Sequence, residues 1–263
     1  MILKKEALKE IIKDELIKIV FQPVISLTNG EVLGYEALSR ITTKTIFKSI
    51  EDLFETAIAH DLIWDLERLS RTKALEAAKE FMVPPYNQKL FLNVHPKVMY
   101  DEKFNQELSD FFLEEYQISP HNIAFDITEK YIIEGQDGFQ TSISQYKSQS
   151  YLFALENSGV DYSGIDAINK IEPNYIKLNM KLIRGIDQDS LRSALVKGMV
   201  EYSKTNNISL IAEGVESSEE FRAVIDLGVQ YAQGYYIQKP HEKTQTIRSE
   251  VRNEILLMNK IRI

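Results

Sequence analysis

The sequence lacks cysteine altogether, and its basic residues are outnumbered: 31 Lys and Arg stand against 39 Asp and Glu, for a formal net charge of −8. Without cysteine there is no disulfide framework, thiolate zinc site or cysteine nucleophile, as is usual in a reducing cytosol. Proteins that coat duplex nucleic acid neutralise many phosphates with Lys and Arg, so the acidic balance argues against that role. A small anionic ligand held by a metal or a few donors remains compatible with it.

The chain also lacks a long hydrophobic run. No stretch approaches the ~18 apolar residues of a membrane span, and Met1-Ile2-Leu3-Lys4-Lys5 leads into charged residues instead of an apolar leader. Seven Pro and 11 Gly are too few for a collagenous or low-complexity chain of 263 residues, and 44% hydrophobic residues are ordinary for a folded domain. We therefore expect a cytoplasmic protein without a membrane span.

No linker rich in Gly, Ser or Pro and no internal repeat divides the sequence. Residues 1–18 have apolar side chains at helical spacing, which predicts an amphipathic N-terminal helix over Ile2 to Ile17. Residues 19–263 are expected to form one domain that ends in a C-terminal helix. The Asn29-Gly30 dipeptide, between apolar runs at 19–22 and 31–35, predicts an antiparallel hairpin because both residues tolerate positive φ.

Beyond the hairpin, helical and strand patterns alternate. Helices are predicted at 49–59, 62–81, 104–116, 138–148, 164–171, 190–204 and 218–227, and further strands at 89–93, 122–127, 151–155, 175–178, 208–212 and 229–232. Eight strands alternating with helices at this length favour a closed eight-stranded α/β barrel, with a doubly wound open sheet as the alternative. Gly135-Gln136-Asp137-Gly138 lacks the spacing of a phosphate-binding loop, which weakens the open-sheet nucleotide folds.

Polar residues follow nearly every predicted strand, at the end where such barrels carry their chemistry. They are Glu36, Asn93, Asp126, Glu129, Glu156, Asn157, Lys177, Glu213, Glu216 and Gln233. Taken singly, a carboxylate there is more often a helix cap or a solvated charge, but Lys177 inside an apolar strand needs a charged partner. The oxygen-rich set suits a hard cation such as Mg²⁺, Mn²⁺ or Ca²⁺, and the four scattered histidines offer no zinc site. A metal-assisted reaction on a phosphate ester is the hypothesis that follows.

Short motifs in a fixed order carry a family resemblance. They are Phe21-Gln22-Pro23, Gly34-Tyr35-Glu36-Ala37-Leu38-Ser39-Arg40, Asn93, Ile127-Thr128-Glu129, Tyr162-Ser163-Gly164, Ile176-Lys177, Ala212-Glu213-Gly214-Val215-Glu216, and Gln233-Gly234-Tyr235 with Pro240. This combination resembles the EAL domain family over nearly the whole chain. Active members of that family hydrolyse the bacterial second messenger cyclic di-GMP to the linear dinucleotide. The resemblance implies a modified (β/α)8 TIM-like barrel with an antiparallel first strand, in agreement with the predicted hairpin.

The resemblance also implies roles for individual residues. Lys177 and Glu213 are similar to the catalytic pair that handles the attacking water, and Arg40 to a phosphate contact. The other implied roles are metal ligation by Glu36, Asn93, Asp126, Glu156 and Asn157, ligand binding by Leu38, Gln233 and Pro240, and bracing of loops by Glu129 and Glu216.

The chain departs from the family pattern at the metal ligands. It has Asp126-Ile127-Thr128-Glu129 where the family has Glu-x-Thr-Glu, and Glu156-Asn157-Ser158-Gly159 where the family has Asp-Asp-Phe-Gly. Asp161 replaces a family glycine, and Asn174 and Asn179 stand where the family usually has aspartates.

These departures differ in weight. Asp126 and Glu156 change the reach of an acid but keep its charge, so we expect Mg²⁺ or Mn²⁺ at a distorted first-metal site. Asn157 replaces a charged ligand by a neutral amide, so we expect the second metal to be lost or weak. Cleavage by two metals needs both ions to clamp the attacking and leaving oxygens.

The sequence therefore favours a degenerate EAL domain that acts as a cyclic di-GMP binding or partner-binding signalling module with little or no hydrolytic activity. One alternative is an active metal-dependent cyclic di-GMP phosphodiesterase, and another is a protein-binding scaffold without nucleotide. Cyclic di-GMP is the expected partner. A protein partner, an attached signalling domain and a homodimer remain open.

Overall fold

The computed structural model describes residues 2–82, 87–99, 101, 103–104, 116, 118–129, 132, 138–157 and 162–261. Its strands are β1 (Ile17–Ser26), β2 (Val32–Ile41), β3 (Lys89–Asn93), β4 (Ile123–Thr128), β5 (Leu152–Asn157), β6 (Tyr175–Leu178), β7 (Ser209–Ala212) and β8 (Tyr231–Ala232). They close into a barrel in sequence order. β1 runs antiparallel to both β2 and β8, and the remaining neighbours are parallel. The predicted TIM-like barrel with an antiparallel first strand is thereby confirmed.

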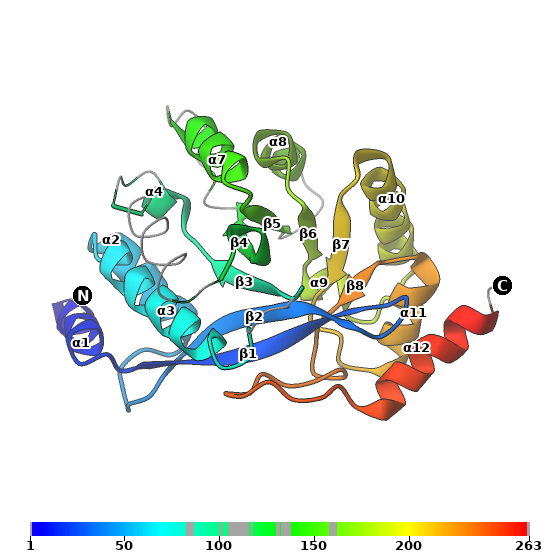
Figure 1. The fold of residues 1–263 in the computed structure, drawn as a ribbon, viewed down its shortest axis with the longest axis horizontal. Coiled ribbons are helices and arrows are strands. Elements are labelled where there is room, and N and C mark those ends of the chain that lie inside the picture. Colours follow the sequence, from blue (N-terminus) through cyan, green and yellow to red (C-terminus); the bar gives the residue numbers. More distant parts are fainter. Residues whose placement is uncertain are drawn as a thin grey trace.

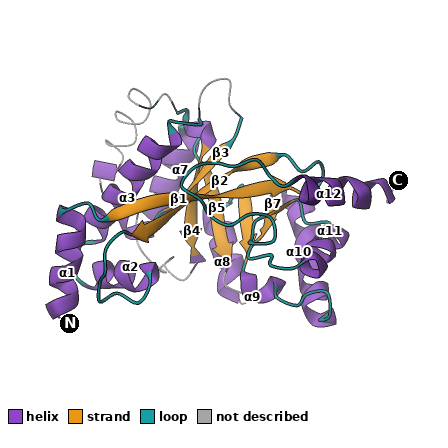
Figure 2. Ribbon diagram, turned by 90° about the horizontal axis from the view of Figure 1, so that it is seen from below, coloured by secondary structure: helices purple, strands orange, loops and turns teal. Residues whose placement is uncertain are grey.

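Helices surround this barrel (Figures 1 and 2). The described helices are α1 (Ile2–Lys13), α2 (Ile50–Ala59), α3 (Ile63–Ala78), α4 (Pro96–Met99), α7 (Phe139–Ser148), α8 (Tyr162–Ile171), α9 (Met180–Ile183), α10 (Ser190–Asn206), α11 (Ser218–Leu227) and α12 (Ser249–Ile261), with a 3₁₀ turn η2 (Pro120–Asn122). None of them is both long enough and apolar enough to cross a bilayer. α1 and α12 lie at opposite ends of the long axis in Figure 1.

Most elements begin or end a few residues from their predicted bounds, and β1 and β2 have ten residues each where the apolar runs were shorter. Two other differences have visible reasons. The first helix ends at Lys13 instead of Ile17, because Glu15 has a positive φ of 52° and Ile17 already starts β1. The last strand has only the two residues that pair with β7, Tyr231 and Ala232. Most of the helix predicted at 104–116 lies outside the described residues.

The hairpin between β1 and β2 forms as the sequence predicts. Of the Asn29-Gly30 pair, only Gly30 has a positive φ, of 73°, and the Asn29 side chain instead accepts the backbone N–H of Glu31 at 3.0 Å. Antiparallel pairing then brings Gln22 beside Glu36 and Lys18 beside Arg40. The turn thus sets the register that carries the second strand to the opposite end of the barrel.

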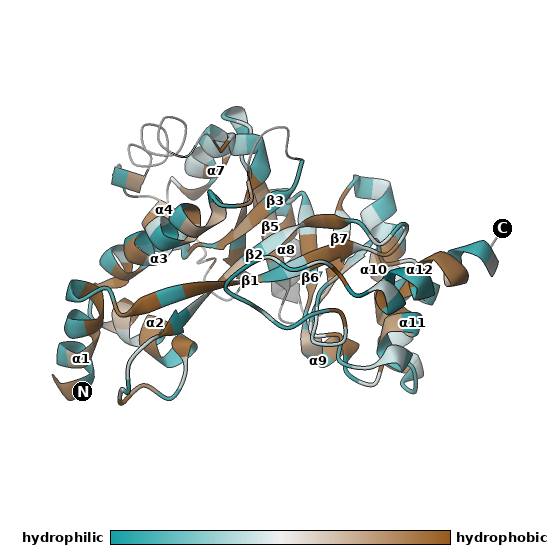
Figure 3. Ribbon diagram, turned by 60° about the horizontal axis from the view of Figure 1, so that its bottom comes forward, coloured by the Kyte–Doolittle hydropathy of each residue, from teal (hydrophilic) through white to brown (hydrophobic). Residues whose placement is uncertain are grey.

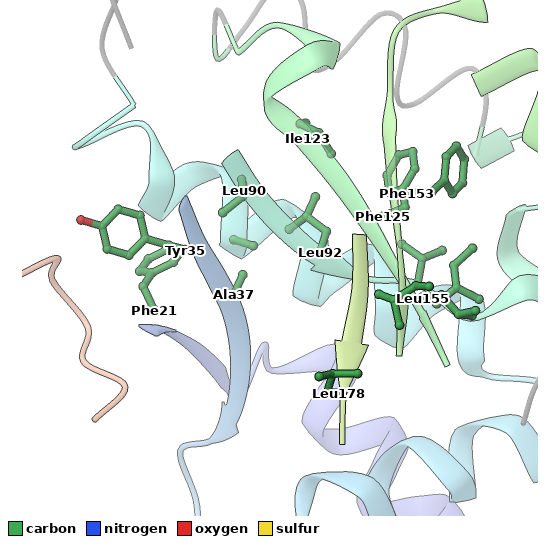
Figure 4. Packing of buried hydrophobic residues seen from close by; sticks show 14 of the residues in the cluster. Phe21, Tyr35, Ala37, Leu90, Leu92, Ile123, Phe125, Phe153, Leu155 and Leu178 are labelled. Atoms are coloured by element: carbon green, nitrogen blue, oxygen red, sulfur yellow. The ribbon is translucent and has the colours of Figure 1, made fainter. Parts of the chain in front are cut away.

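Two apolar layers hold the barrel together. The outer layer joins the outward faces of the strands to the helices, and includes Leu8 and Ile11 of α1. Figure 4 shows part of it, where the Phe125 and Phe153 rings lie 5.8 Å apart. The hydropathy colouring agrees, since hydrophobic residues run along the strands while the helices alternate between the two colours (Figure 3).

The inner layer fills the barrel and fixes where the chemistry lies. It consists of Val24, Phe91, Ala124, Ala154, Tyr175 and Ile211. Because side chains alternate along a strand, the residue two positions after each inner residue also points into the barrel. For the parallel strands those residues are Asn93, Asp126, Glu156, Lys177 and Glu213.

Candidate functional site

The inward-pointing residues meet on a buried lysine. The Lys177 Nζ lies 2.5 Å from Asp126 Oδ2, 2.8 Å from Glu213 Oε1 and 3.1 Å from Glu36 Oε2. Lys177 is 1% exposed and Asp126 is 2% exposed, so the charges are compensated within the protein and not by solvent. The sequence expectation that Lys177 needs carboxylate partners is met by three of them.

The pKa values of this cluster reflect competition between burial and charge. Burial acts to lower the pKa of Lys177, but Asp126, Glu213 and Glu36 outweigh it, so that pKa lies well above its ordinary value. Burial also raises the pKa of Glu213 to about 7, against the opposing effect of Lys177. For Glu36, burial is outweighed by Lys177 and by hydrogen bonds, and its pKa is lowered.

Two amides complete the first ring around the lysine. The Gln233 Nε2 donates to Glu36 Oε2 at 2.6 Å and to Glu213 Oε1 at 3.3 Å. The Asn93 Nδ2 donates to the other oxygen of Glu36 at 3.3 Å. The structure therefore brings together side chains from six different strands or strand ends, all of them predicted from the sequence.

Asp126 and Glu156, the two acids of altered length, have different hydrogen-bond partners. Asp126 is bonded to Lys177, whereas Glu156 accepts the Thr128 hydroxyl at 2.6 Å from the neighbouring position on β4. The Asn157 side chain lies outside the described residues.

The predicted metal ligands offer oxygen atoms, as a hard cation requires, but the ammonium group of Lys177 already contacts two of them, Glu36 and Asp126. Within the described residues, no three His, Asp or Glu side chains are arranged about one point as a metal ion requires. The Asp126 Oδ1 and the Gln233 Oε1 are buried oxygens that accept no hydrogen bond from the described residues. The side chains therefore match a hard divalent cation in the type of ligand atom but, in the described part of the chain, are not arranged around one. Lys177 competes with such a cation for the same carboxylates.

A cavity of about 720 Å³ opens beside the lysine cluster. One part of it is lined by Glu36, Leu38, Arg40, Asn93, Asp126, Thr128 and Glu156, and another by Asn179 before α9 and Lys181 within it. Glu36, Leu38 and Arg40 share one face of β2, because they are two residues apart. The size is typical of small-molecule sites.

Of the lysine cluster, Glu36, Asn93 and Asp126 line the cavity, whereas Lys177, Glu213 and Gln233 are not among the lining residues. Pro240 is half-buried in the segment after β8 and is not part of the cavity wall; the next residue, His241, pairs with Phe21 of β1. Glu129 is buried at the end of β4. Glu216 forms an ion pair with Arg184 at 2.7 Å on the surface.

The loop between β7 and α11 is held by a residue that the sequence reasoning missed. Glu220 is 3% exposed and accepts the backbone N–H groups of Gly185 at 3.0 Å and Glu216 at 2.9 Å. The signal was present, since Ser217 and Glu220 have the Ser-x-x-Glu spacing of a capping box.

A second missed group lies in the cavity wall on α3. Glu67, Ser70 and Arg71 line the cavity together with His95. Glu67 is 4% exposed, and burial raises its pKa to about 8 in spite of the nearby Arg71. The sequence signal was a Glu and an Arg four residues apart on the helix face that also carries Ile63, Leu66 and Ala74.

This raised pKa predicts a pH-dependent contribution to stability. Since the folded pKa of about 8 exceeds the ordinary value of 4.5, the contribution is complete below the ordinary value and is lost as the pH rises towards 8. Relative to wild type, Glu67→Gln should therefore raise the thermal midpoint more at pH 9 than at pH 5. Thermal melts at the two pH values test this, with the exposed Glu76→Gln on the same helix as the control. An equal shift of Glu67→Gln at both pH values would contradict the assignment.

The fold and this rim define a class: a TIM-like barrel with one antiparallel strand and an acid-lined cavity over a buried lysine. The sequence profile of the EAL domain matches residues 5–240. The chain belongs to the EAL domain family.

Similar proteins agree with this assignment. A probable cyclic di-GMP phosphodiesterase of Escherichia coli, PdeB, is 25% identical over 242 residues, which make up 92% of this chain and 46% of PdeB. A standalone versatile EAL protein of Vibrio cholerae, solved in its c-di-GMP-bound form, is 28% identical with a TM-score of 0.75, over 89% of this chain and 97% of that one. The Klebsiella pneumoniae BlrP1 complex with calcium and cyclic di-GMP has the same fold, with a TM-score of 0.78 at 24% identity over 88% of this chain and 58% of BlrP1. The chain spans only about half the length of curated relatives such as PdeB.

Proposed function

We propose that this EAL domain binds cyclic di-GMP in the cavity at the C-terminal rim and hydrolyses it slowly or not at all. The observation that carries the proposal is the 720 Å³ cavity, which joins Arg40 on its wall to the acid-lined rim around Lys177. The relatives add support, because their names refer to cyclic di-GMP hydrolysis or binding.

The cavity offers different groups to the two parts of such a ligand. Arg40 is half-buried at the end of β2, and its Nη1 donates to the Ser39 carbonyl at 2.8 Å, which leaves other guanidinium N–H groups for a phosphate. Leu38 and the apolar residues Ile50 and Phe54 of the cavity wall suit the faces of a guanine base. Gln233 is not in the cavity wall; its side-chain amide holds Glu36 and Glu213 in place.

Glu36, Asn93, Asp126 and Glu156 would hold a Mg²⁺ or Mn²⁺ ion on the rim. When bound, such an ion withdraws charge from a phosphate oxygen and makes a coordinated water more acidic. Glu213 is suited to take a proton from water, because burial raises the pKa of its carboxyl group and Lys177 holds its Oε1 at 2.8 Å.

Slow turnover follows from changes at three positions where the family has acids, which are Asp126, Glu156 and Asn157 in this chain. Asn157 lacks the charge of the acid that stands there in the family, and hard cations depend on ligand charge for affinity. Asp126 contacts Lys177 at 2.5 Å and Glu156 accepts the Thr128 hydroxyl at 2.6 Å, so both acids would have to give up these partners, in whole or in part, to coordinate a metal ion. Binding through Arg40 does not depend on either acid.

The retained Lys177–Glu213 pair also supports a second candidate, an active metal-dependent phosphodiesterase that tolerates Asn157. The two candidates share the binding site and differ in turnover.

Isothermal titration calorimetry with cyclic di-GMP, with and without Mg²⁺ or Mn²⁺, tests binding. We expect heat of binding in both conditions, a modest effect of metal, and a rise of the thermal midpoint with ligand concentration. Absence of both heat and thermal protection at high ligand concentration would overturn the proposal and favour a protein-binding scaffold.

Arg40→Ala is expected to weaken cyclic di-GMP binding by about tenfold or more, because a charge-assisted contact to phosphate is lost. Removal of metal with EDTA should weaken binding less. Arg252→Ala is the matched control, because Arg252 packs beside Gly30 at the opposite end of β2. Calorimetry on the three proteins provides the comparison, and a larger loss with EDTA than with Arg40→Ala would assign the main contact to metal instead.

A further inference from the structure

A buried carboxyl group of α3 reaches the loop that follows β3. Glu67 Oε1 accepts the backbone N–H of His95 at 2.6 Å. Both residues are buried, at 4% and 7% exposure, so loss of the carboxyl group would leave a buried N–H without this acceptor. The bond ties α3 to the loop after β3, at a residue two positions beyond Asn93.

The same loop is fixed on its other sides. The Val94 N–H donates to the carbonyl oxygen of Asp126 on β4 at 2.9 Å. The Lys97 N–H donates to His95 Nδ1 at 3.1 Å, at the start of α4. Glu67 supplies the connection to the neighbouring helix.

Glu67 is itself held in place. Arg71, one turn further along α3, has its Nη1 3.7 Å from Glu67 Oε2. Its guanidinium carbon lies 4.5 Å from the centre of the Phe104 ring and 5.7 Å from that of Trp64. A carboxyl group fixed in this way leaves the loop little freedom to shift.

The loop begins at Asn93, whose side chain faces the cavity and donates to Glu36 at 3.3 Å. We propose that Glu67 is a positioning residue of the ligand site, which holds Asn93 over Glu36 by accepting the N–H of His95. The inference rests on the proposed function, since it assumes that ligand binds where Asn93 lies.

The proposal assigns Glu67 the role of a hydrogen-bond acceptor. Glu67→Leu removes the acceptor at similar side-chain size and leaves the buried N–H of His95 without it. The loop must then move to pair this N–H, and a shift beyond about 0.5 Å is enough to impair a binding site. Glu67→Gln keeps a carbonyl oxygen that accepts the same N–H.

Calorimetry with cyclic di-GMP on these variants tests the inference. We expect Glu67→Leu to weaken binding about tenfold, and the separate variant Glu67→Gln to bind within about threefold of wild type. Leu75→Ala is the matched control, because Leu75 is 1% exposed in the outer apolar layer and lies about two turns after Glu67 on the same helix. It should lower the thermal midpoint while leaving the affinity unchanged.

A double-mutant cycle then shows whether Glu67 acts through Asn93. In the Asn93→Ala background, Glu67→Leu should cost less than about threefold in affinity, because the group that it positions is already absent. Full additivity of the two losses would overturn the inference. Glu67→Met, which also lacks the acceptor, serves if Glu67→Leu does not fold.

A measurement without ligand separates this inference from the proposed function. In NMR spectra of the ligand-free protein, the side-chain amide signals of Asn93 should shift in Glu67→Leu and stay near their wild-type positions in Glu67→Gln and Leu75→Ala. Wild-type protein that gives no heat with cyclic di-GMP refutes the proposed function, and the inference with it as a statement about that ligand. Wild-type binding combined with unchanged binding and unchanged Asn93 signals in Glu67→Leu refutes the positioning role alone.

Discussion

Asn157→Asp is expected to raise the rate of cyclic di-GMP hydrolysis in Mn²⁺ by about tenfold or more, because it restores a negative charge where the family has an acid. Adding Asp126→Glu and Glu156→Asp should raise the rate further, since these changes restore reach and not charge. The three effects should be strongly non-additive, because all three residues serve one cluster. Formation of the linear dinucleotide, followed by chromatography, is the measurement.

Three controls link such a gain to the site. Lys177→Ala or Glu213→Ala in the repaired background should abolish it, because both residues belong to the buried cluster at the rim. Asn206→Asp adds the same charge at an exposed position at the end of α10 and should change nothing. A triple variant without turnover would place the defect elsewhere, for example in the loop with Ser158 and Asp161, which lies outside the described residues.

The second large effect concerns stability. Lys177→Met should destabilise the fold by about 3–5 kcal/mol, the usual cost of removing one partner from a buried ion pair. The lysine lies within 3.1 Å of three carboxylates, and these would be left buried without a cation. The free energy of unfolding from urea titration measures the loss, and the exposed Lys197→Met of α10 is the control.

The pH dependence of this loss has a definite sign. Burial already holds the pKa values of Asp126 and Glu213 above their ordinary values, and Lys177 lowers the pKa of all three carboxyl groups, so removal of the lysine raises these folded pKa values and favours the protonated forms in the folded state. The destabilisation should therefore be largest near pH 8 and smallest near pH 5. Mn²⁺ should restore part of the stability of Lys177→Met at pH 8 if the carboxylates can hold a divalent cation in place of the ammonium group. A variant as stable as wild type at pH 8 would show that Lys177 is not the counter-ion of this cluster.

Much of the fold was predictable because the strands have short, regular patterns. In Tyr175-Ile176-Lys177-Leu178, both faces of a parallel strand are buried, so a lysine there has to meet charges from neighbouring strands. The order of elements then places Asp126, Glu213 and Glu36 at the same end of one barrel. The strand periodicity of two therefore carries most of the information about the site.

The residues on helices were harder to predict. The spacing of Glu67 and Arg71 shows that both lie on the buried face of α3, but not that this face borders the loop after β3. That neighbour is set by the packing of the helix on the barrel, to which residues far along the chain contribute. The ligand-binding role of Pro240 stays a prediction; the next residue, His241, pairs with Phe21 of β1.

The central claim is that this chain binds cyclic di-GMP without efficient turnover. A single-turnover assay tests it most directly: protein in excess over labelled cyclic di-GMP in Mn²⁺, at concentrations where calorimetry shows the ligand to be bound, with the products separated by chromatography over time. The account predicts that nearly all of the bound label is recovered as the cyclic dinucleotide, while the triple variant Asn157→Asp, Asp126→Glu, Glu156→Asp converts it to the linear form. Rapid and complete conversion by the wild-type protein would contradict the account and establish an active phosphodiesterase.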